Sequence, residues 1–599
     1  MESQDNRPNT ELEKDLQTET PAGTPPPPEE PSYAPPPGPK KSVAPLIIGI
    51  AAAVVILCGI CLVGVILWKT GALLIFAPKR AAPKIMPADI TFFVSIDMDI
   101  KDRAGYKHLA EVYGDIPEVE DAVDDFLDQM EDELGMSYED DIKPWLGPEL
   151  AMGIANMQNA LIGGDPVVII AAGTRDKRAS DAFLEEMLEY LEDGGYEVGD
   201  GAYQKVEYYV AEPENEWETP LILGTVKKFV ILTMDEDAMQ DVIDAAKGKS
   251  DSLADNERYT ELVGALPGDA VACVFFDIED LMEVGLQGFK EGLGTPGLDL
   301  PSTTTDQLEA FQAVGLALDL DREGIQFDFA ATFDPDALSS EMLDSLEAKA
   351  SANRILKRVP DDALGFLSGQ NLAAVWKSAL ASLKEVPDVE QQLGDLGDQL
   401  GLDLDEELLN WLPGEFAVAL LEAKGVEEVP VGGFAVFEID DREEAEDALE
   451  DIVGAVKEFA YFEFNKEDIG GVEMQIVVDP DSEDVILGYG FTDKHLVIGF
   501  TEDALAAAAD DDIGPIAADE TFKKVQEHLP SKTGGYLYVN VEAALRLAYK
   551  NMPDMERKEF DESARPFLEP ISAMGVAAPP ADAKKGVSLG TLFLYVPGE

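Results

Sequence analysis

The chain has 599 residues, and 120 Asp and Glu against 44 Lys and Arg give it a formal net charge of −76. This length exceeds what one hydrophobic core supports, so we expect at least two domains. The 46% hydrophobic content argues against wholesale disorder. Nucleic acid is excluded as a partner because phosphate binding needs clustered basic residues.

Residues 1–45 have the composition of a disordered tail. Proline dominates from Pro21 to Lys41, and no apolar periodicity is present. Such composition favours polyproline II and cannot build a core. A flexible tether is the preferred interpretation, and a ligand for a proline-binding groove is the alternative.

The run from Leu46 to Trp68 is strongly apolar and contains no charged residue. As a helix it would be about 35 Å long, enough to cross a hydrocarbon core of about 30 Å. It is too long and too deep in the chain for a cleaved signal peptide. We therefore predict an uncleaved single-pass helix that contacts the lipid bilayer, followed by a basic juxtamembrane linker over residues 69–85.

Two sequence features favour opposite orientations of this helix in the membrane. Lys40 and Lys41 lie on one side, and Lys69, Lys79, Arg80 and Lys84 on the other, so the local count of basic residues favours a cytoplasmic C-terminal side. Long domains, however, translocate largely regardless of charge. We expect the C-terminal domain outside the cytoplasm, and a cytosolic domain is the alternative.

The negative charge belongs entirely to the large domain. Residues 1–85 hold 8 basic and 8 acidic residues, and the remainder holds 36 basic and 112 acidic residues. Self-repulsion keeps such a domain soluble and monomeric, and the same surface could bind cations or a basic envelope protein. The composition alone does not show whether the excess of acidic residues is an adaptation to a saline habitat or serves to bind ions.

Short segments recur in the same order at nearly constant spacing. WLGPELAMGI, which begins at Trp145, matches WLPGEFAVAL, which begins at Trp411. KKFVILTMDEDAM, which contains Ala238, matches DKHLVIGFTEDAL, which contains Ala504, at the same spacing. Chance similarities would scatter in spacing. We infer two homologous halves, residues 86–350 and 355–599.

Strand and helix patterns alternate within each half. Phe92, Val94, Ile96 and Met98 recur with period two and predict a half-buried strand. Helices are predicted at 177–192 and 235–246, and at a segment with apolar residues at helical spacing: Val119, Val123, Phe126, Met130 and Leu134. The segments 204–210 and 221–233 are predicted as adjacent antiparallel strands. The fold class is therefore α+β, present twice, with largely antiparallel sheets.

This order of features resembles a bacterial family, domain of unknown function 3352. The resemblance rests on MPADITFFVSI, on the acidic segment leading to DIKPWLGPELAMGI, and on KKFVILTMDEDAM. It covers nearly all of residues 86–599. Members look like membrane-anchored envelope proteins without established activity, so the resemblance implies a location and a fold and supplies no catalytic residues.

Apparent motifs for cysteine and nucleotide chemistry have simpler explanations. Cys58 and Cys61 form Cys-x-x-Cys inside the apolar run, where a thiolate is disfavoured. Cys273 has no partner in the large domain. The glycines of 292–297 lack the strand and helix of a dinucleotide site, and Gly248-Lys249-Ser250 follows a helix rather than a strand.

The carboxylates at Asp479, Asp481, Glu483 and Asp484 alternate like ligands of a calcium loop. The EF-hand pattern fails because Gly490 stands at its twelfth position in place of Glu. A solvated hairpin loop is preferred, and these four residues remain the only metal candidates. No catalytic or cofactor-binding residues are predicted, since His108, His495 and His528 fall in no recognisable catalytic context.

The sequence thus predicts a membrane-anchored, extracytoplasmic, duplicated α+β protein with a binding or structural role in the bacterial envelope, and an enzyme is not favoured. A metal-dependent enzyme or calcium-binding module is the alternative.

Overall fold

The computed structural model describes residues 80–599 apart from short and long gaps. The gaps are residues 102, 115, 118–135, 157–165, 214–218, 280–309, 339, 347–348, 374–376, 378–410, 424–430, 461–462, 480–483, 511 and 599. The predicted tail, membrane helix, most of the linker and the predicted helix through Val119 to Leu134 lie outside the described residues. Within the described part of the chain, no helix is both long and apolar enough to cross a membrane.

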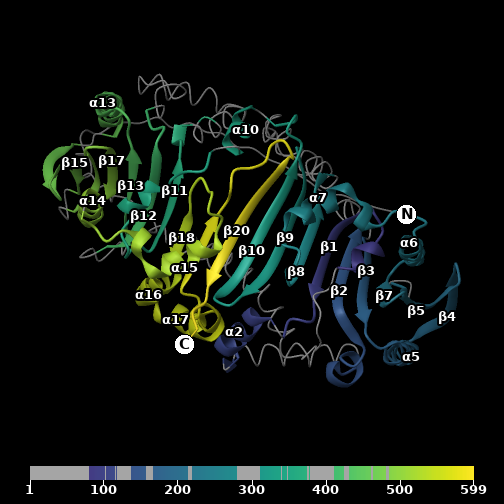
Figure 1. Ribbon diagram of the computed structural model, residues 1–599. Coiled ribbons are helices and arrows are strands. Elements are labelled where there is room, and N and C mark those ends of the chain that lie inside the picture. The colour runs from purple at the N-terminus through teal and green to yellow at the C-terminus, as the bar shows by residue number, and fades with distance from the viewer. Residues whose placement is uncertain are drawn as a thin grey trace, which may run out of the picture. The chain divides into compact units, whose positions relative to one another are not determined.

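Ten strands of the first half form a continuous antiparallel sheet (Figure 1). Their order across the sheet is β4-β5-β6-β7-β3-β2-β1-β8-β9-β10. Their bounds are β1 Ile90–Asp97, β2 Leu146–Ala155, β3 Val167–Thr174, β4 Tyr196–Tyr203, β5 Val206–Pro213, β6 Leu221–Val226, β7 Phe229–Thr233, β8 Ala272–Asp277, β9 Phe311–Asp321 and β10 Gly324–Phe333.

The second half repeats this order, β14-β15-β16-β17-β13-β12-β11-β18-β19-β20, again with every pair antiparallel. Position by position, β11 to β20 take the places of β1 to β10. Their bounds are β11 Gly365–Gln370, β12 Glu415–Glu422, β13 Val431–Glu438, β14 Asn465–Ile469, β15 Val472–Val478, β16 Val485–Phe491, β17 His495–Phe500, β18 Leu537–Asn540, β19 Ala573–Ala577 and β20 Val587–Tyr595.

The two halves join edge to edge through their last strands. β10 and β20 pair antiparallel from Gly324↔Tyr595 to Thr332↔Val587, so twenty strands form one sheet. Side chains reinforce this junction, because Lys524 Nζ lies 2.9 Å from a Glu323 carboxylate oxygen. His528 lies 3.1 Å from Asp321.

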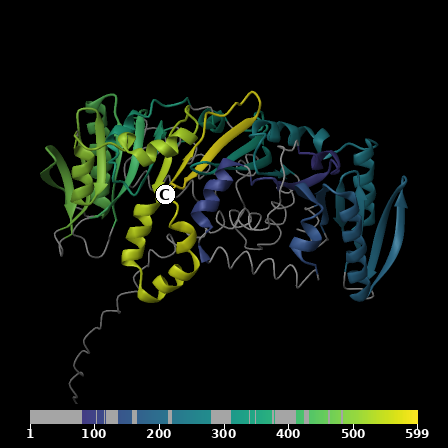
Figure 2. The same cartoon turned by 60° about the horizontal axis from the view of Figure 1, so that its bottom comes forward.

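Helices pack on both faces of the sheet (Figures 1 and 2). In the first half, α6 and α7 cover one face and α5 covers the other. In the second half, α14 and α15 cover the face that corresponds to that of α6 and α7, and α13 covers the face that corresponds to that of α5. The described helices are η1 Ala82–Lys84, α2 Ala104–Tyr113, η2 Tyr138–Ile142, α5 Lys177–Asp193, α6 Glu236–Lys247, η3 Leu253–Asp255, α7 Glu257–Ala265, α10 Ser340–Leu346, η4 Arg354–Arg358, α13 Arg442–Ala460, α14 Glu502–Ala509, η5 Ile516–Ala518, α15 Glu520–His528, α16 Val541–Asn551, α17 Asp554–Ser563 and α18 Arg565–Leu568.

The two-sided packing explains the burial along β1. Alternation with period two is confirmed, but Phe93 and Ser95 form the fully buried face, and Phe92, Val94 and Ile96 are half-buried. Successive side chains of a strand point to opposite faces, and here both faces carry a packed layer. The large antiparallel sheet and its helices make the fold α+β.

Local signals place the helix ends where the sequence predicts them. The Asp176 side chain accepts from the backbone N–H groups of Arg178 and Ala179 and so begins α5. Asp235 begins α6 in the same way, and Gly248 ends it with φ of +67°. Left-handed backbone favours glycine, so the Gly248-Lys249-Ser250 segment is a helix terminus, as predicted.

The predicted strands at 204–210 and 221–233 have the wrong boundaries. Gln204 and Lys205 both have positive φ and make the two-residue turn between β4 and β5. Likewise, Lys227 has positive φ and divides 221–233 into β6 and β7. Two-residue hairpins with such turns are ordinarily marked by Asn or Gly, which are absent here. The antiparallel pairing predicted between the segments is confirmed for β5 and β6.

Candidate functional site

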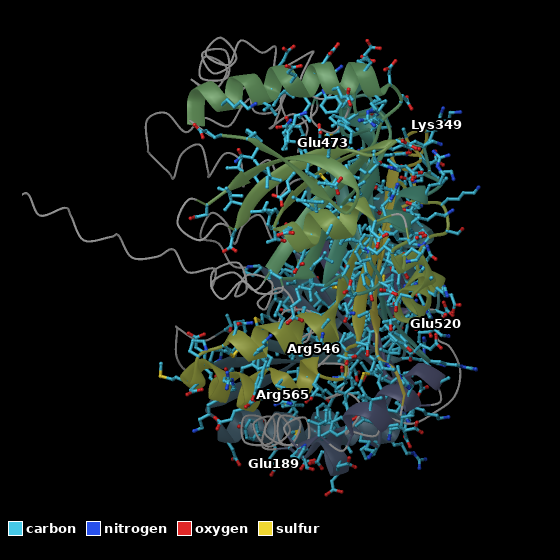
Figure 3. All side chains as sticks on the ribbon, turned by 90° about the vertical axis from the view of Figure 1, so that its left-hand side faces the viewer. Glu189, Lys349, Glu473, Glu520, Arg546 and Arg565 are labelled. Carbon is cyan, nitrogen blue, oxygen red and sulfur yellow. The ribbon has the colours of Figure 1, made fainter. Side chains whose placement is uncertain are left out.

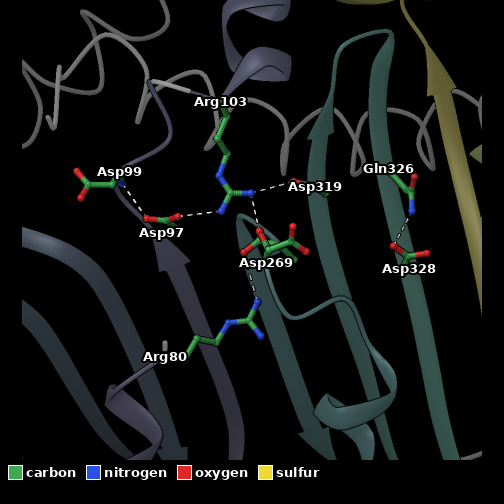
Figure 4. A network of polar contacts seen from close by, with 9 residues as sticks. Arg80, Asp97, Asp99, Arg103, Asp269, Asp319, Gln326 and Asp328 are labelled. Atoms are coloured by element: carbon green, nitrogen blue, oxygen red, sulfur yellow. Dashed lines mark hydrogen bonds and ion pairs between the residues drawn. The ribbon is translucent and has the colours of Figure 1, made fainter. Parts of the chain in front are cut away.

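A network of charged side chains lies where the chain enters the first half (Figure 4). At its centre is Arg103, just before α2. The guanidinium lies 3.0 Å from Asp97 at the end of β1 and 3.1 Å from Asp319 on β9, and it donates to the Asp269 carbonyl. Asp97 is also tied to its own chain, since it accepts from the backbone N–H of Asp99. One side chain thus binds three separate parts of the chain.

Glu149 on β2 faces Asp97 across the β1–β2 ladder and is only 4% exposed. Its carboxylate accepts from the backbone N–H of Ala81 at 2.8 Å and of Ala82 at 3.2 Å, the residues that begin η1. Burial raises the pKa of Glu149, and the two backbone bonds and nearby Arg80 counteract that rise. Glu149 therefore fixes the first residues of the described chain to the sheet.

The space inside this network is very small. Arg80, Asp97, Arg103 and Glu149 line it together with Ser95, Ile96 and residues 268–270, and about 10 Å³ is open to the centre of a water molecule. That is room for about one water. Each of the four charged groups already has a partner. The arrangement can position backbone, and it leaves no space for an organic substrate.

The second half contains part of the same arrangement. Glu415, 6% exposed, faces Gln370 across the β11–β12 ladder. Its carboxylate accepts from the backbone N–H of Ile355 at 2.8 Å and from the Ser351 hydroxyl at 2.6 Å. A buried glutamate thus holds a short helix at the start of each half. Gln370 stands in the place of Asp97, so the second half has a neutral side chain at this position.

A wider hollow, about 460 Å³, lies beside α17 and α18. It is lined by Ile116, Pro117, Asp561, Arg565, Pro566, Glu569 and Pro570. Arg565 lies 3.1 Å from both Asp561 and Glu569 and stacks over the Tyr549 ring. The charged groups of this hollow are paired with each other, and three prolines make much of the remaining wall.

The calcium candidates fall on the β15–β16 connection. The backbone N–H of Asp479 donates to the Asp484 carbonyl at 2.8 Å, which closes a hairpin. Asp481 and Glu483 lie outside the described residues. Among the residues with described positions, no three His, Cys, Asp or Glu side chains are grouped to hold a metal ion.

The other sequence candidates are dispersed. Cys273 is buried on β8, and burial raises the pKa of its thiol, which disfavours the reactive thiolate. His495 begins β17 beside Arg358, and His108 and His528 contact the opposite half at the junction. Cys58, Cys61 and the glycines of 292–297 lie outside the described part.

Sequence reasoning missed the Arg103 network. Glu149 and Glu415 were visible as the shared acid of the two Trp-Leu motifs, each standing at the same position after Trp145 or Trp411. Arg103 carries no such signal, because two of its three partners, Asp269 and Asp319, lie 166 and 216 residues away. Surface carboxylates outnumber these buried ones, as Glu189, Glu473 and Glu520 illustrate (Figure 3).

Comparison with known proteins identifies a family and no activity. None of the curated proteins searched matches the chain. Crystal form IV of TP0453 covers 44% of this chain and 83% of its own, with 9% identity and a TM-score of 0.22, and form III covers 42% and 78%, with 8% identity and a TM-score of 0.21. The model of DUF3352, a protein family of unknown function, matches residues 50–596. The chain therefore belongs to the DUF3352 family.

Proposed function

We propose that this chain is a single-pass membrane-anchored protein whose large acidic domain lies outside the cytoplasm and has a binding or structural role in the bacterial cell envelope. The uncharged apolar run from Leu46 to Trp68 carries the anchoring part of this proposal, and the contact of Glu149 with Ala81 and Ala82 supports a structural role for the domain. This contact grips the chain a short distance after Trp68, where the apolar run ends.

The composition of the network supports a structural role over a catalytic one. Its acids and guanidinium groups are paired, and the remaining space holds about one water. Catalytic acids and bases need access to a reacting group. Contacts that only hold the start of η1 on the sheet, as those of Glu149 do, need no such access. Arg103 adds a further contact of this kind with β9.

We further propose that the two halves arose by duplication. Their identical strand order and their matching buried glutamates support this origin, together with the repeated Trp145 and Trp411 segments. The joined halves present one long sheet, and such a surface suits binding an extended or large envelope partner. The excess of carboxylates makes that partner cationic.

The topology is tested by protease accessibility in the cells of origin. Digestion of the large domain in intact spheroplasts, with a cytosolic marker protein left whole, is the expected result. Protection of the domain until lysis would place it in the cytosol and end the envelope proposal. Carbonate extraction of the membranes separates anchoring from loose attachment, since an anchored chain stays in the pellet.

A calcium-binding module is the second candidate, favoured by the closed hairpin that brings Asp479 and Asp484 together. A ligand that binds only the native state raises its melting temperature. A saturable rise at sub-millimolar calcium, abolished by Asp479→Asn with Asp484→Asn, would establish this module. A rise that magnesium reproduces equally would reflect general screening of the charge.

A further inference from the structure

An apolar patch lies open on the sheet of the second half. Leu367, Val418, Leu420 and Leu537 are 40–49% exposed. Leu367 pairs with both Val418 and Leu537, and Leu420 is two residues beyond Val418, so the four share one face of β18, β11 and β12. We refer to these four residues as the open patch.

The matching positions of the first half are less exposed. Val94, Met152, Ile154 and Val274 have the same pairing on β1, β2 and β8, and all four are half-buried. Contiguous exposed apolar surface ordinarily marks an interaction site. The open patch is therefore a surface that lacks its occupant.

The neighbouring chain leaves and returns on this same face. Leu372 follows β11, Trp411 precedes β12, and both belong to the apolar cluster that includes Phe416 and Phe437. Phe416 is two residues before Val418 and so points to the same side of β12. Residues 378–410, which lie outside the described positions, are thus tethered at both ends beside the open patch. Such tethering gives the segment a high effective concentration there.

The sequence of this segment has a matching apolar series. Six of its apolar residues recur at spacings of three and four: Val389, Leu393, Leu396, Leu400, Leu404 and Leu408. The next member of the series is Trp411, which is 9% exposed and packs on the sheet. Between them stand acids such as Asp395 and Asp398. An apolar stripe of this kind is stable when it packs on an apolar surface, while the acidic residues between its members stay exposed to water.

We infer that residues 378–410 dock their leucine stripe on the open patch of β11, β12 and β18. The segment ends at the sheet face that carries the open patch. Its apolar series continues into Trp411, and the open patch supplies four aliphatic side chains for it to contact. Docking removes apolar surface from water on both sides, which favours the docked state.

A cysteine reporter in the full chain tests this inference. Val418→Cys sits in the open patch, and Ile486→Cys is a matched strand position, 44% exposed, on β16. Maleimide labelling followed by peptide mass spectrometry separates both from Cys58, Cys61 and Cys273. We expect Val418→Cys to label at least tenfold more slowly than Ile486→Cys. Equal rates would overturn the inference.

Substitutions in the segment identify the occupant. The combined substitutions Leu393→Ser, Leu396→Ser and Leu400→Ser should bring the labelling rate of Val418→Cys to that of Ile486→Cys. The pair Asp395→Asn and Asp398→Asn is the control on the same segment and should leave Val418→Cys slow to label. Slow labelling that survives the serine variant would overturn the inference, and relief by dilution would then assign the patch to a second copy.

A second reporter covers the case in which the serine variant fails to fold. A short bismaleimide should join Val418→Cys to Leu404→Cys within one chain and should not join Ile486→Cys to Leu404→Cys. The reverse pattern, or no cross-link from either position, would contradict docking at the open patch.

Discussion

Replacing Glu149 with alanine should loosen the start of the first half. The substitution leaves the N–H groups of Ala81 and Ala82 without their acceptor, and of these two residues Ala82 is buried and Ala81 is exposed. One buried unsatisfied donor costs about 1–3 kcal/mol. The one methylene that is lost adds about 0.8 kcal/mol, and water can solvate the exposed N–H of Ala81. Ala82 and Met86, both fully buried, lie directly on the loosened segment. We expect a loss of about 2–4 kcal/mol in local stability.

Native-state hydrogen exchange measures this loss for each half separately. Protection should fall for amides of η1, β1 and β2 and stay unchanged in β11 and β12. Glu415→Ala is the matched control, because it removes the equivalent acceptor of Ile355 and should produce the mirror pattern. Glu473→Ala, at a 70% exposed carboxylate, should change neither half. A loss below about 0.5 kcal/mol for Glu149→Ala, the size of an ordinary surface substitution, would refute the reasoning.

Three further predictions concern charge. Arg103→Met leaves Asp97, which is 7% exposed, without its cation, and should lower the free energy of unfolding by urea by about 2–4 kcal/mol. Arg103→Lys should have a stability between those of Arg103→Met and wild type. Equal stability of Arg103→Met and wild type would show that the network does not stabilise the fold. Burial raises the pKa of Asp319, so its contribution to stability is greatest below the unfolded value of about 3.9 and is lost as the pH rises through the folded pKa. Asp319→Asn removes that term, and its stability relative to wild type should improve from pH 4 to pH 7; an unchanged difference would contradict the assigned cause. Finally, NaCl from 0.01 to 1 M shortens the Debye length from about 30 Å to about 3 Å, and should raise the melting temperature of this chain of net charge −76 by several degrees; a flat or falling curve would show that self-repulsion is negligible.

Elements with a local cause were predictable. α5 and α6 match the predicted helices because Asp176, Asp235 and Gly248 supply their ends. The turn at Gln204 and Lys205 was missed because neither residue is a usual left-handed turn former. The more buried face of β1 was also missed, since periodicity shows that a strand has two faces and does not say which one meets the deeper layer.

Part of the candidate site was encoded in the repeat. Glu149 and Glu415 occupy equal places in the two Trp-Leu motifs, and the structure adds that both are buried acceptors of backbone N–H groups. Nothing local distinguishes Arg103 or Asp319 from the other charged residues of so acidic a chain. Their pairing depends on β1 and β9 being brought beside the same loop.

The sequence by itself determined the two-fold recurrence of segments, the alternation of strands and helices and the family, because each is written in residues close together or in a constant spacing. Only the tertiary structure decided that β10 pairs with β20, that Arg103 joins three separate parts of the chain, and that the four side chains of the open patch gather on one face of β11, β12 and β18. These features depend on contacts between residues far apart in sequence, which form once long loops have closed and which leave no local periodicity behind.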